Sequence, residues 1–462
     1  MHAQNSLTFV AALILAAACG GTDVVATSDG GASLDGSPTP TDGAPATDAA
    51  PLSDGRAAFC VGRGPAVVVP GATRDVCTGE VAERVFRYAV CACESFEPVG
   101  SFVTDSFDSD ADGTITDSGG PVGTNGTFSS TSTVDIGGTL SSAGLDEVTF
   151  VGSGIRVGGD LRAGGSVRLT GEGAVARDAR VVGDVAGIGS FSIARDLHQP
   201  AGSTAVGVRV GGDTITGPVS VAPPCPCGDD VLDIGAIVAA TATDNHNAEV
   251  DLAPDAYTDL VSEHRITLPC GRFYLDGIGG TGGLTLEVAG RTALFVGGDV
   301  TIAGSLNVEL GPEGELDVFI AGTLQGAGTL SFGDPERPAA TRVYVGGAGE
   351  VSLQGTSAFV GNLYAPRAPI SFTGESEIYG SVFGRRVEAA GSLGVHYDRA
   401  ILEVGEDCPD TPPPTCDRCG DCPGGYTCGG DGTCGTTCES DADCCDPLTC
   451  DVPTGVCTSI LI

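Results

Sequence analysis

Short apolar runs separated by glycine and aspartate turns repeat between residues 155 and 217, "IRVGGDLRAGGSVRLTGEGAVARDARVVGDVAGIGSFSIARDLHQPAGSTAVGVRVGGDTITG". Each run holds about three to five residues, mostly Val, Ile or Leu, which is the length of a short strand. Four aspartates recur in equivalent places at intervals of 18, 18 and 17 residues: Asp160, Asp178, Asp196 and Asp213. This regular period predicts a parallel β-solenoid with one coil per period, alternate residues facing the core and glycine at the corners. A β-sandwich of hairpins would show longer strands and less regular repetition.

The same pattern returns from Leu284 to about His396, with uneven spacing that predicts projecting loops such as "GDPERPAATR". Residues 223–283 interrupt it with a predicted helix in "LDIGAIVAATATDNHN" and a second helical patch in "DAYTDLVSEH". Cys225, Cys227 and Cys270 are expected to tie this insert down. The predicted fold class is therefore all-β: a parallel β-solenoid in two runs, 101–222 and 284–404, interrupted by a small, partly helical insert and followed by a disulfide-rich C-terminal module.

The N-terminus has the pattern of an export signal, because the apolar run "LTFVAALILAAAC" ends in small residues and Cys19. Residues 1–19 resemble a bacterial lipoprotein signal, which implies that Cys19 is lipidated and becomes the first mature residue. The segment before the run lacks Lys and Arg, and Leu15 lies four residues before the cysteine where the usual motif has three. An ordinary cleaved secretory signal is the alternative. The run is shorter than the roughly 20 residues of a membrane span.

Residues 20–55 are rich in Ala, Thr, Asp, Ser, Pro and Gly, a composition that predicts a disordered tether. Behind a lipid anchor, this tether would hold the folded part away from the membrane. We therefore expect an exported protein, lipid-anchored to the bacterial cell envelope at the outer membrane or cell surface, whose membrane contact is the anchor alone.

Cysteine usage supports export, because removing Cys19 from the 19 cysteines leaves an even number suited to disulfides in an oxidising compartment. In the Cys-bearing segment 56–100, "EVAERVFRYAVCAC" predicts a small helix.

The C-terminal module, 405–462, has the spacing of small disulfide-knotted domains, and its "CDRCGDC" run is interpreted as disulfides, not as metal thiolates. Seven cysteines before it and eleven within it require at least one bridge between body and module, with Cys408 the candidate. The candidate disulfide cysteines are Cys60, Cys77, Cys91, Cys93, Cys225, Cys227, Cys270, Cys408, Cys416, Cys419, Cys422, Cys428, Cys434, Cys438, Cys444, Cys445, Cys450 and Cys457.

The loop "SFDSDADGTITDSGGPVGTNG", residues 106–126, begins as an EF-hand calcium loop does. The residues that would fill its first positions are Asp108, Asp110, Asp112 and Gly113. Gly119 stands where the twelfth-position glutamate is expected, and Asp105 or Asp117 would supply further ligands. The alternative is a solvated acidic turn that leads into the first coil. Calcium is the one cofactor that the sequence suggests.

Two other groups of polar residues are candidates for a site or a structural cap. "TDNHNAEVD" brings together Asp244, His246, Glu249 and Asp251, which suit either a metal site or helix capping. His396, Tyr397 and Asp398 stand where the solenoid is expected to end, and we predict that they form a buried polar cap.

Several segments together resemble an uncharacterised β-solenoid domain of exported, surface-anchored and pilus-associated bacterial proteins, most often myxobacterial-type lipoproteins. They are "TDSFDS…GPVGTNG", "DIGAIVAATATDNHNAEVDL", "LPCGRFYL", "GRTALFVGGDVTIAG", "GNLYAPRAPI" and "IYGSVFGRRVEAAGSLGVHYD", spread over most of 90–400. This resemblance implies an exported solenoid and brings no catalytic residues. The strand pattern is also similar to that of bactofilins, which form polymers, but only in architecture. The C-terminal module resembles Dickkopf-type and knottin-like modules, which implies a disulfide framework alone.

The charge and aromatic content bear on function. A formal charge of −38, with all 22 basic residues arginine, repels nucleic acid and anionic lipid and attracts cations. The chain has no Trp and 5% aromatic residues, which disfavours sugar stacking, and no G-x-S-x-G or H-E-x-x-H motif or phosphate-cradling loop stands in a suitable context. We therefore predict a non-enzymatic structural or adhesive envelope lipoprotein, with an envelope protein or polysaccharide as its partner. The alternatives are a polymer subunit that self-associates through its solenoid ends and a β-helix polysaccharide lyase or hydrolase.

Overall fold

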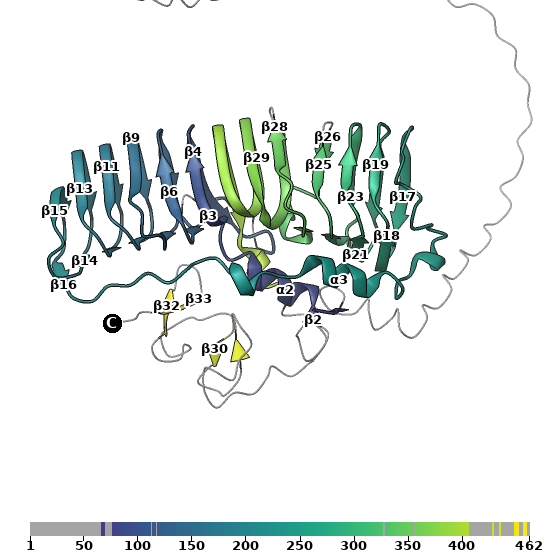
Figure 1. The fold of residues 1–462 in the computed structure, drawn as a ribbon, viewed down its shortest axis with the longest axis horizontal. Helices are drawn as coiled ribbons and strands as arrows, with labels where there is room; N and C mark the ends of the chain where they lie inside the picture. Colours follow the sequence, from purple (N-terminus) through teal and green to yellow (C-terminus); the bar gives the residue numbers. More distant parts are fainter. Residues whose placement is uncertain are drawn as a thin grey trace, which may run out of the picture. The chain divides into compact units, whose positions relative to one another are not determined.

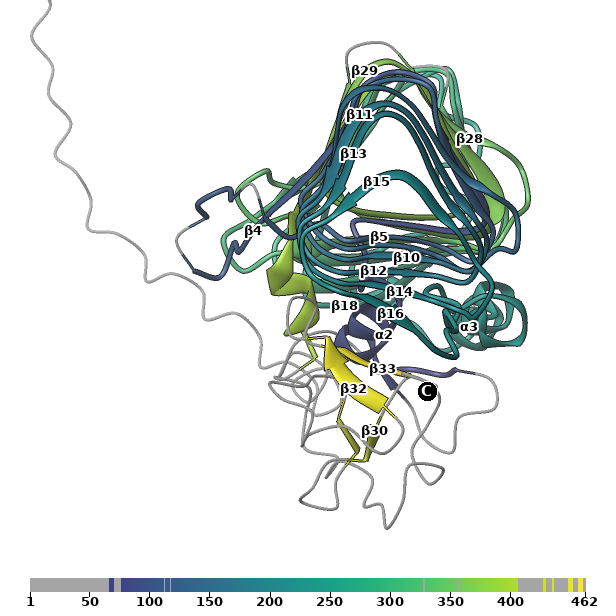
Figure 2. The ribbon, with the colours of Figure 1, turned by 90° about the vertical axis from the view of Figure 1, so that its left-hand side faces the viewer.

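The computed structural model describes residues 66–69, 76–111, 113–116, 118–326, 329–354 and 357–405, together with four short C-terminal strands. This part of the chain is mostly β, a parallel β-solenoid of about twelve coils with two α-helices (Figures 1 and 2). The predicted fold class is therefore confirmed. The helices are α2 (Thr78–Val85) and α3 (Ile234–Thr241).

Each coil winds around an apolar core with a roughly triangular section, seen end-on in Figure 2. The strands of the first run are β3 (Val90–Pro98), β4 (Phe102–Phe107), β5 (Val122–Thr124), β6 (Thr127–Ser130), β7 (Val134–Ile136), β8 (Leu140–Ser142), β9 (Val148–Val157), β10 (Leu161–Ala163), β11 (Val167–Val175), β12 (Ala179–Val181), β13 (Val185–Ile193), β14 (Leu197–Gln199), β15 (Ala205–Val210) and β16 (Thr214–Thr216). Those of the second run are β17 (His264–Leu268), β18 (Gly271–Leu275), β19 (Ile278–Gly280), β20 (Leu284–Val288), β21 (Arg291–Val296), β22 (Val300–Ile302), β23 (Ser305–Leu310), β24 (Glu315–Ile320), β25 (Leu324–Gly326), β26 (Thr329–Ser331), β27 (Thr341–Val345), β28 (Val351–Gln354) and β29 (Ser357–Asp398).

Three antiparallel pairs of short strands and four 3-10 turns complete the described elements. β1 (Ala66–Val67) pairs with β2 (Val76–Cys77), and the C-terminal strands form two hairpins. The hairpin strands are β30 (Thr427–Cys428), β31 (Cys434–Gly435), β32 (Leu448–Asp451) and β33 (Val456–Ser459). The 3-10 turns are η1 (Gly228–Asp230), η2 (Asn247–Glu249), η3 (Pro338–Ala340) and η4 (Arg399–Leu402).

The repeated aspartates form a ladder along one corner of the first run. The carboxylate of Asp160 accepts the backbone N–H of Asp178 at 3.2 Å, and Asp178 accepts that of Asp196 at 3.1 Å. Asp196 in turn accepts the N–H of Asp213 at 2.8 Å. Each carboxylate satisfies a corner amide of the next coil, where ladder pairing is interrupted. This explains why aspartate recurs once per coil.

The coils do not stack in chain order (Figure 1). The first run starts in the middle of the stack and winds to one end at β16. Residues 218–256, here called the return segment, then lead to the other end, from which the second run winds inward. Its last coil lies against the first coil of the chain: β29 pairs in parallel with β3 and β4. We call this junction the seam. The two runs are therefore one continuous solenoid.

The structure corrects two expectations for the segment 223–283. Helix α3 is present, with the Asp233 side chain accepting the N–H of Ala236 at its N-terminus. The helical patch predicted over 255–264 is wrong, because these residues form turns, a bridge from Leu260 to Gly280 and the start of β17. Leu260 is buried at the end of the core. Most of 264–283 therefore belongs to the solenoid and not to an insert.

The helix predicted over residues 80–93 is confirmed only in its first part. α2 ends at Val85, and the following "VCAC" lies in β3. Val90 and Ala92 are buried with the core, while Cys91 and Cys93 point away from it to disulfide partners. Side chains that alternate between the core and the disulfides are typical of a strand. The edge of the last coil also lies beside this segment and pairs with it. The first coil therefore begins before residue 101.

Candidate functional site

The seam carries the triad of polar residues that the sequence placed at the end of the solenoid. His396 on β29 contacts Asp105 on β4 through Nδ1, 2.9 Å from Oδ1, and Glu377 through Nε2, 3.0 Å from Oε2. The hydrogen bond to Asp105, opposed by burial and helped by Glu377, raises the pKa of His396. The predicted cap is therefore misplaced: these residues lie in the middle of the stack, where the two ends of the chain meet.

Asp398 is the most connected residue of the seam. Its fully buried carboxylate accepts the N–H of Ser109 at 3.0 Å, the Ser109 hydroxyl at 2.7 Å and the N–H groups of Ala339 and Ala400. Burial raises the pKa of Asp398, while these four donors oppose the shift. Beside it, the buried Tyr397 hydroxyl donates to the Phe86 carbonyl at 2.7 Å. The carboxylate thus fixes three loops, at 109, η3 and η4, to one strand.

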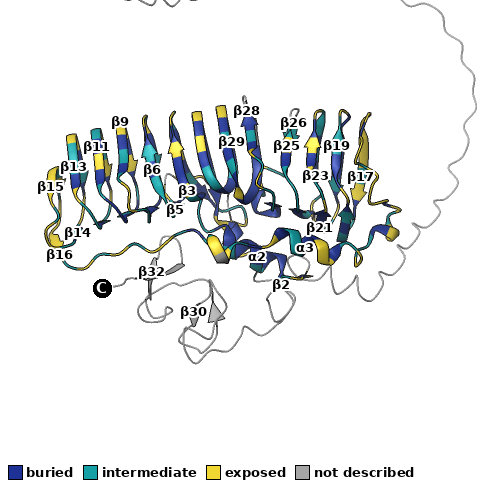
Figure 3. Cartoon of the chain, viewed as in Figure 1, coloured by how far each residue is buried: buried dark blue, intermediate teal, exposed yellow. Residues whose placement is uncertain are grey.

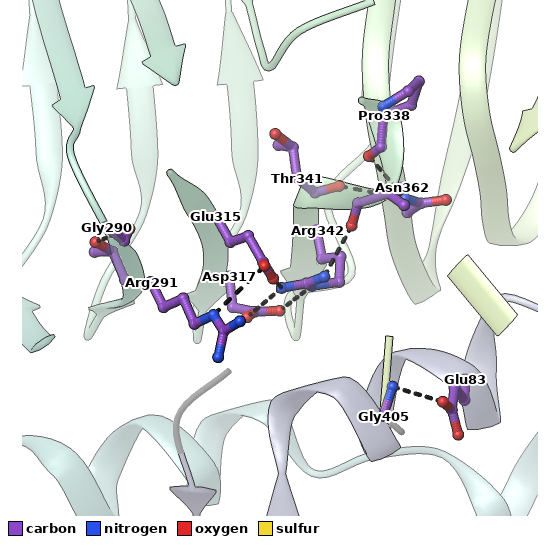
Figure 4. A network of polar contacts seen from close by, with 12 residues as sticks. Glu83, Gly290, Arg291, Glu315, Asp317, Pro338, Thr341, Arg342, Asn362 and Gly405 are labelled. Atoms are coloured by element: carbon purple, nitrogen blue, oxygen red, sulfur yellow. Dashed lines mark hydrogen bonds and ion pairs between the residues drawn. The ribbon is translucent and has the colours of Figure 1, made fainter. Parts of the chain in front are cut away.

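A buried ion pair lies beside the seam on the side of the triangle that faces α2 and α3, which we call the base (Figure 4). Arg342 Nε donates to Asp317 Oδ1 at 2.6 Å and Arg342 Nη2 donates to Oδ2 at 3.0 Å, a bidentate pair on adjacent strands. Glu315 and the Ala339 carbonyl accept further bonds from the guanidinium. Burial would lower the pKa of Arg342, but attraction by Asp317 outweighs it and raises the pKa. Both partners are about 1% exposed, so neither is placed to meet a ligand.

An aromatic ladder runs along the base next to this ion pair. Phe295, Phe319 and Tyr344 stand on neighbouring strands with rings stacked at 5.2 and 4.5 Å, and Tyr364 and Phe383 continue the row. Phe86, after α2, packs on this row, and the Tyr364 hydroxyl accepts the N–H of Leu232 in the return segment. Helices and return segment therefore cover this face as a second apolar layer, and β21, β24 and β27 are buried along almost their whole length.

The sequence contained a signal for this layer that the periodicity argument missed. The strands "ALFV", "DVFI" and "RVYV" are apolar at successive positions, which is typical of strands covered on both faces. The alternation in the first run, such as Leu161, Arg162 and Ala163, is typical of strands with one exposed face. The difference predicts that helices lie over the second run and not over the first.

Two disulfides tie the return segment to the first coil. Cys91 is bonded to Cys225, and Cys93 to Cys227. Asn125 adds two hydrogen bonds to the backbone of Cys225, at 2.8 and 2.9 Å. Cys77 and Cys270 are also disulfide-bonded. Cys19, Cys60 and most of the C-terminal cysteines, Cys408 among them, lie outside the described residues.

The proposed calcium loop forms a hairpin after β4, closed by a bridge between Ser106 and Thr116. The Asp108 side chain accepts the N–H of Asp110 at 3.1 Å, which is an Asx turn. Asp112 and Asp117 lie outside the described residues. Within the ranges that the structure describes, no group of three or more His, Cys, Asp or Glu side chains is arranged to hold a metal ion.

The other candidate metal group caps a strand edge. The Nδ1 atom of His246 accepts the backbone N–H of Arg272 on β18 at 3.0 Å. The backbone N–H of His246 donates to the Arg272 carbonyl. Asn247 bonds both the N–H and the carbonyl of Tyr274, at 2.8 and 2.7 Å. Asp244 forms an ion pair with Arg272. These side chains replace a neighbouring strand at the edge of β18.

A shallow groove of about 530 Å³ crosses the side of the second run formed by β19, β22 and β25. Glycines and polar side chains line it. Its lining includes Gly280, Thr301, Ile302, Gln325, Glu350 and Ser352.

Comparison with known proteins finds one matching family, whose function is unknown. Residues 229–404 match the family described as "Domain of unknown function (DUF7305)". This range holds α3 and the second run, so the resemblance to an uncharacterised solenoid domain is confirmed there; the lipoprotein and Dickkopf-like resemblances remain predictions. Among solved structures, the chain is similar to an ice binding protein from an Antarctic bacterium, Flavobacteriaceae, with 11% identity, 69% of this chain and 97% of that chain covered, and a TM-score of 0.20. No curated protein matches. Within the described ranges, no helix has the length and apolar character needed to cross a membrane.

Proposed function

We propose that this chain is a non-enzymatic structural or adhesive protein of the bacterial cell envelope. A lipid on Cys19 and the acidic segment 20–55 would hold a rigid solenoid away from the membrane. The observation that supports this proposal best is the seam, because it joins both runs around one continuous apolar core.

Rigidity follows from how the coils are connected. An inner coil pairs with neighbours on both sides, so bending it separates parallel strands and opens the core at once. The ion pair of Arg342 joins two adjacent strands, the carboxylate of Asp398 holds three loops, and two disulfides hold the return segment onto this stack. Such a body suits a spacer, or an adhesin that presents one side to an envelope protein or polysaccharide.

The anchor is tested by comparing the wild type with Cys19→Ala in a diderm bacterial host fed labelled palmitate. We expect the wild type to carry label and fractionate with the outer membrane, and the variant to be unlabelled and released. Unlabelled wild-type protein, or a variant that stays in the membrane fraction, would refute the lipid anchor. Cells that carry anchored protein should bind envelope polysaccharide or neighbouring cells better than cells that release it. Equal binding would contradict the adhesive role.

The enzyme alternative is tested with the purified mature chain on a panel of bacterial and plant polysaccharides. We expect no reducing ends and no unsaturated products. Release that disappears in Gln325→Ala and Glu350→Ala, which border the groove, and persists in the control Glu309→Ala on another side would replace our proposal by a lyase or hydrolase. Electron microscopy at high protein concentration tests the polymer alternative. We expect single particles, and filaments would favour a polymer subunit.

A further inference from the structure

One side of the second run carries a row of hydrogen-bonding side chains. Its strands are β19, β22, β25 and β28, which belong to four successive coils because each follows one of the paired base strands. Thr301 and Gln325 are exposed and Ser352 is half-buried, while the residue before each of them in the chain is buried. Figure 3 shows the same alternation of buried and exposed positions along strands on the sides of the solenoid.

The shallow groove lies on this side and crosses the strands. Its lining includes Gly280 on β19 and Ser352 on β28, so it extends over four coils. Three strand spacings of about 4.8 Å amount to roughly 14 Å. Its volume of about 530 Å³ lies within the range of roughly 300–1,000 Å³ that is usual for small-molecule sites. The groove therefore suits an extended ligand that contacts several coils at once, such as a few units of a polymer.

The charge of the groove is low for this chain. Among the described lining residues, Glu350 alone is ionisable. On the corresponding side of the first run, Arg168 on β11 forms an ion pair with Glu147. Because the chain has a formal charge of −38 and the lining contains no cation, a negatively charged ligand would be repelled. The ligand class that fits is therefore uncharged.

The lining side chains match a ligand rich in hydroxyl groups. The Gln325 amide can donate and accept, and the Thr301 hydroxyl can do both. The Glu350 carboxylate accepts the Ser371 hydroxyl at 2.5 Å, which holds it in place, and a carboxylate can accept several hydrogen bonds at once. Ala303 adds an apolar contact for the carbon side of a sugar ring. Donors, acceptors and a small apolar surface together are what a neutral sugar requires.

We propose that this groove binds a neutral glycan chain, with Gln325 and Glu350 as its main hydrogen-bonding residues. The inference rests on the adhesive form of the proposed function and names the chemical class of its polysaccharide partner. No aromatic ring stands among the described lining residues, so one contact is weak, and many anchored copies on a cell add their contacts.

Saturation-transfer NMR on the purified mature chain tests the ligand class. The neutral probes are cellohexaose, maltohexaose and N-acetylated chitohexaose, and hexagalacturonate is the anionic comparison. We expect neutral probes to bind and hexagalacturonate to bind about tenfold more weakly or not at all, because the chain repels anions. Binding should strengthen from one sugar unit upward and then level off, because the groove covers four coils.

Variants of the lining test the location. Gln325→Ala and Glu350→Ala should each weaken binding about tenfold, since each removes hydrogen bonds to the ligand. Glu350→Gln keeps an acceptor oxygen and should bind nearly as the wild type does. Glu309→Ala, on another side of the solenoid, is the matched control and should leave binding unchanged. Thermal unfolding of all four variants checks that each is folded.

Three results would overturn the inference. Failure of every neutral probe to bind would remove the ligand class, and equal binding of hexagalacturonate would show that charge does not select the ligand. Binding that is the same in the wild type, Gln325→Ala and Glu350→Ala would place the contact outside the groove. In each case the comparison of cells with anchored and released protein still decides the adhesive role by itself.

Discussion

Asp105 and His396 lie 291 residues apart in the chain and contact one another across the seam at 2.9 Å. They stand on the first and last coils, so the contact joins the two runs. Each run alone would end in an unpaired edge at this place. Contacts at the seam therefore contribute to the stability of the whole stack and not only to one coil.

The His396 contact should make the seam pH-dependent. Because the folded state raises the pKa of His396, its contribution is complete below the ordinary value of about 6.5 and is lost as pH rises through the raised value. We expect wild type to exceed His396→Gln in unfolding free energy by about 1 kcal/mol at pH 6, and this difference to shrink toward pH 9. Urea unfolding at a series of pH values measures it. A difference between wild type and His396→Gln that stays the same from pH 6 to pH 9 would contradict the prediction.

Removing Arg342 should be strongly destabilising. Arg342→Met leaves the Asp317 carboxylate buried without its partner, which costs about 3–5 kcal/mol. Arg342→Met/Asp317→Leu removes both charges and should recover most of that loss. Arg291→Met, which breaks a longer pair with Glu315 in which Arg291 is 26% and Glu315 18% exposed, should cost clearly less, on the order of 1 kcal/mol. Denaturant titration of the four proteins decides the matter: a double variant as unstable as the single one would contradict this account.

The parts of the fold that the sequence predicted are those with a local repeat. Asp160, Asp178 and Asp196 each bond the next coil, so the same residue is required once per coil and the period can be read directly. α3 was predictable for a similar reason, since its apolar residues and its capping Asp233 lie within a few positions of each other.

The seam could not be predicted, because it depends on residues almost 300 positions apart. Val90 pairs with Val382 and Phe102 with Leu393, and neither side shows a period that would indicate its partner. The sequence predicts that the polar residues His396 to Asp398 form a buried group, but the end of the strand pattern there favours a cap. Because the last coil stacks on the first, these residues lie at a junction between two coils and not at an end. Likewise, His246 and Asn247 suit a metal site or a helix cap by composition, and only the edge of β18 shows their use.

The aspartate ladder predicts a graded response to substitution. Asp178→Ala leaves the corner N–H of Asp196 without its acceptor and should cost about 1–2 kcal/mol. Asp178→Asn keeps an acceptor oxygen and should cost less. Asp213→Ala is the control, because no further rung follows among the described residues, and should change the midpoint little. Thermal unfolding of the three variants tests this order, and an equal loss for Asp178→Ala and Asp213→Ala would show that the ladder bond is dispensable.

The two disulfides should stabilise the closed stack. Each joins cysteines 134 residues apart, and a crosslink over such a loop restricts the unfolded chain by about 3–5 kcal/mol. We expect Cys91→Ala/Cys225→Ala and Cys93→Ala/Cys227→Ala each to lower the denaturation midpoint, and the fourfold variant to lower it further, with the strand signal in circular dichroism retained. Asn125→Ala, which removes only the two hydrogen bonds to Cys225, should have a smaller effect.

The fourfold variant should also change how the seam closes. The disulfides hold the return segment on the first coil, so the second run of a chain is kept near its own first run. Without them, the second run of one copy can dock on the first run of another, which forms a domain-swapped dimer through the same contacts. Light scattering after refolding at low and high protein concentration should therefore show dimers for the fourfold variant and monomers for the wild type. A fourfold variant that refolds as a monomer at every concentration, with an unchanged midpoint, would show that packing alone closes the seam.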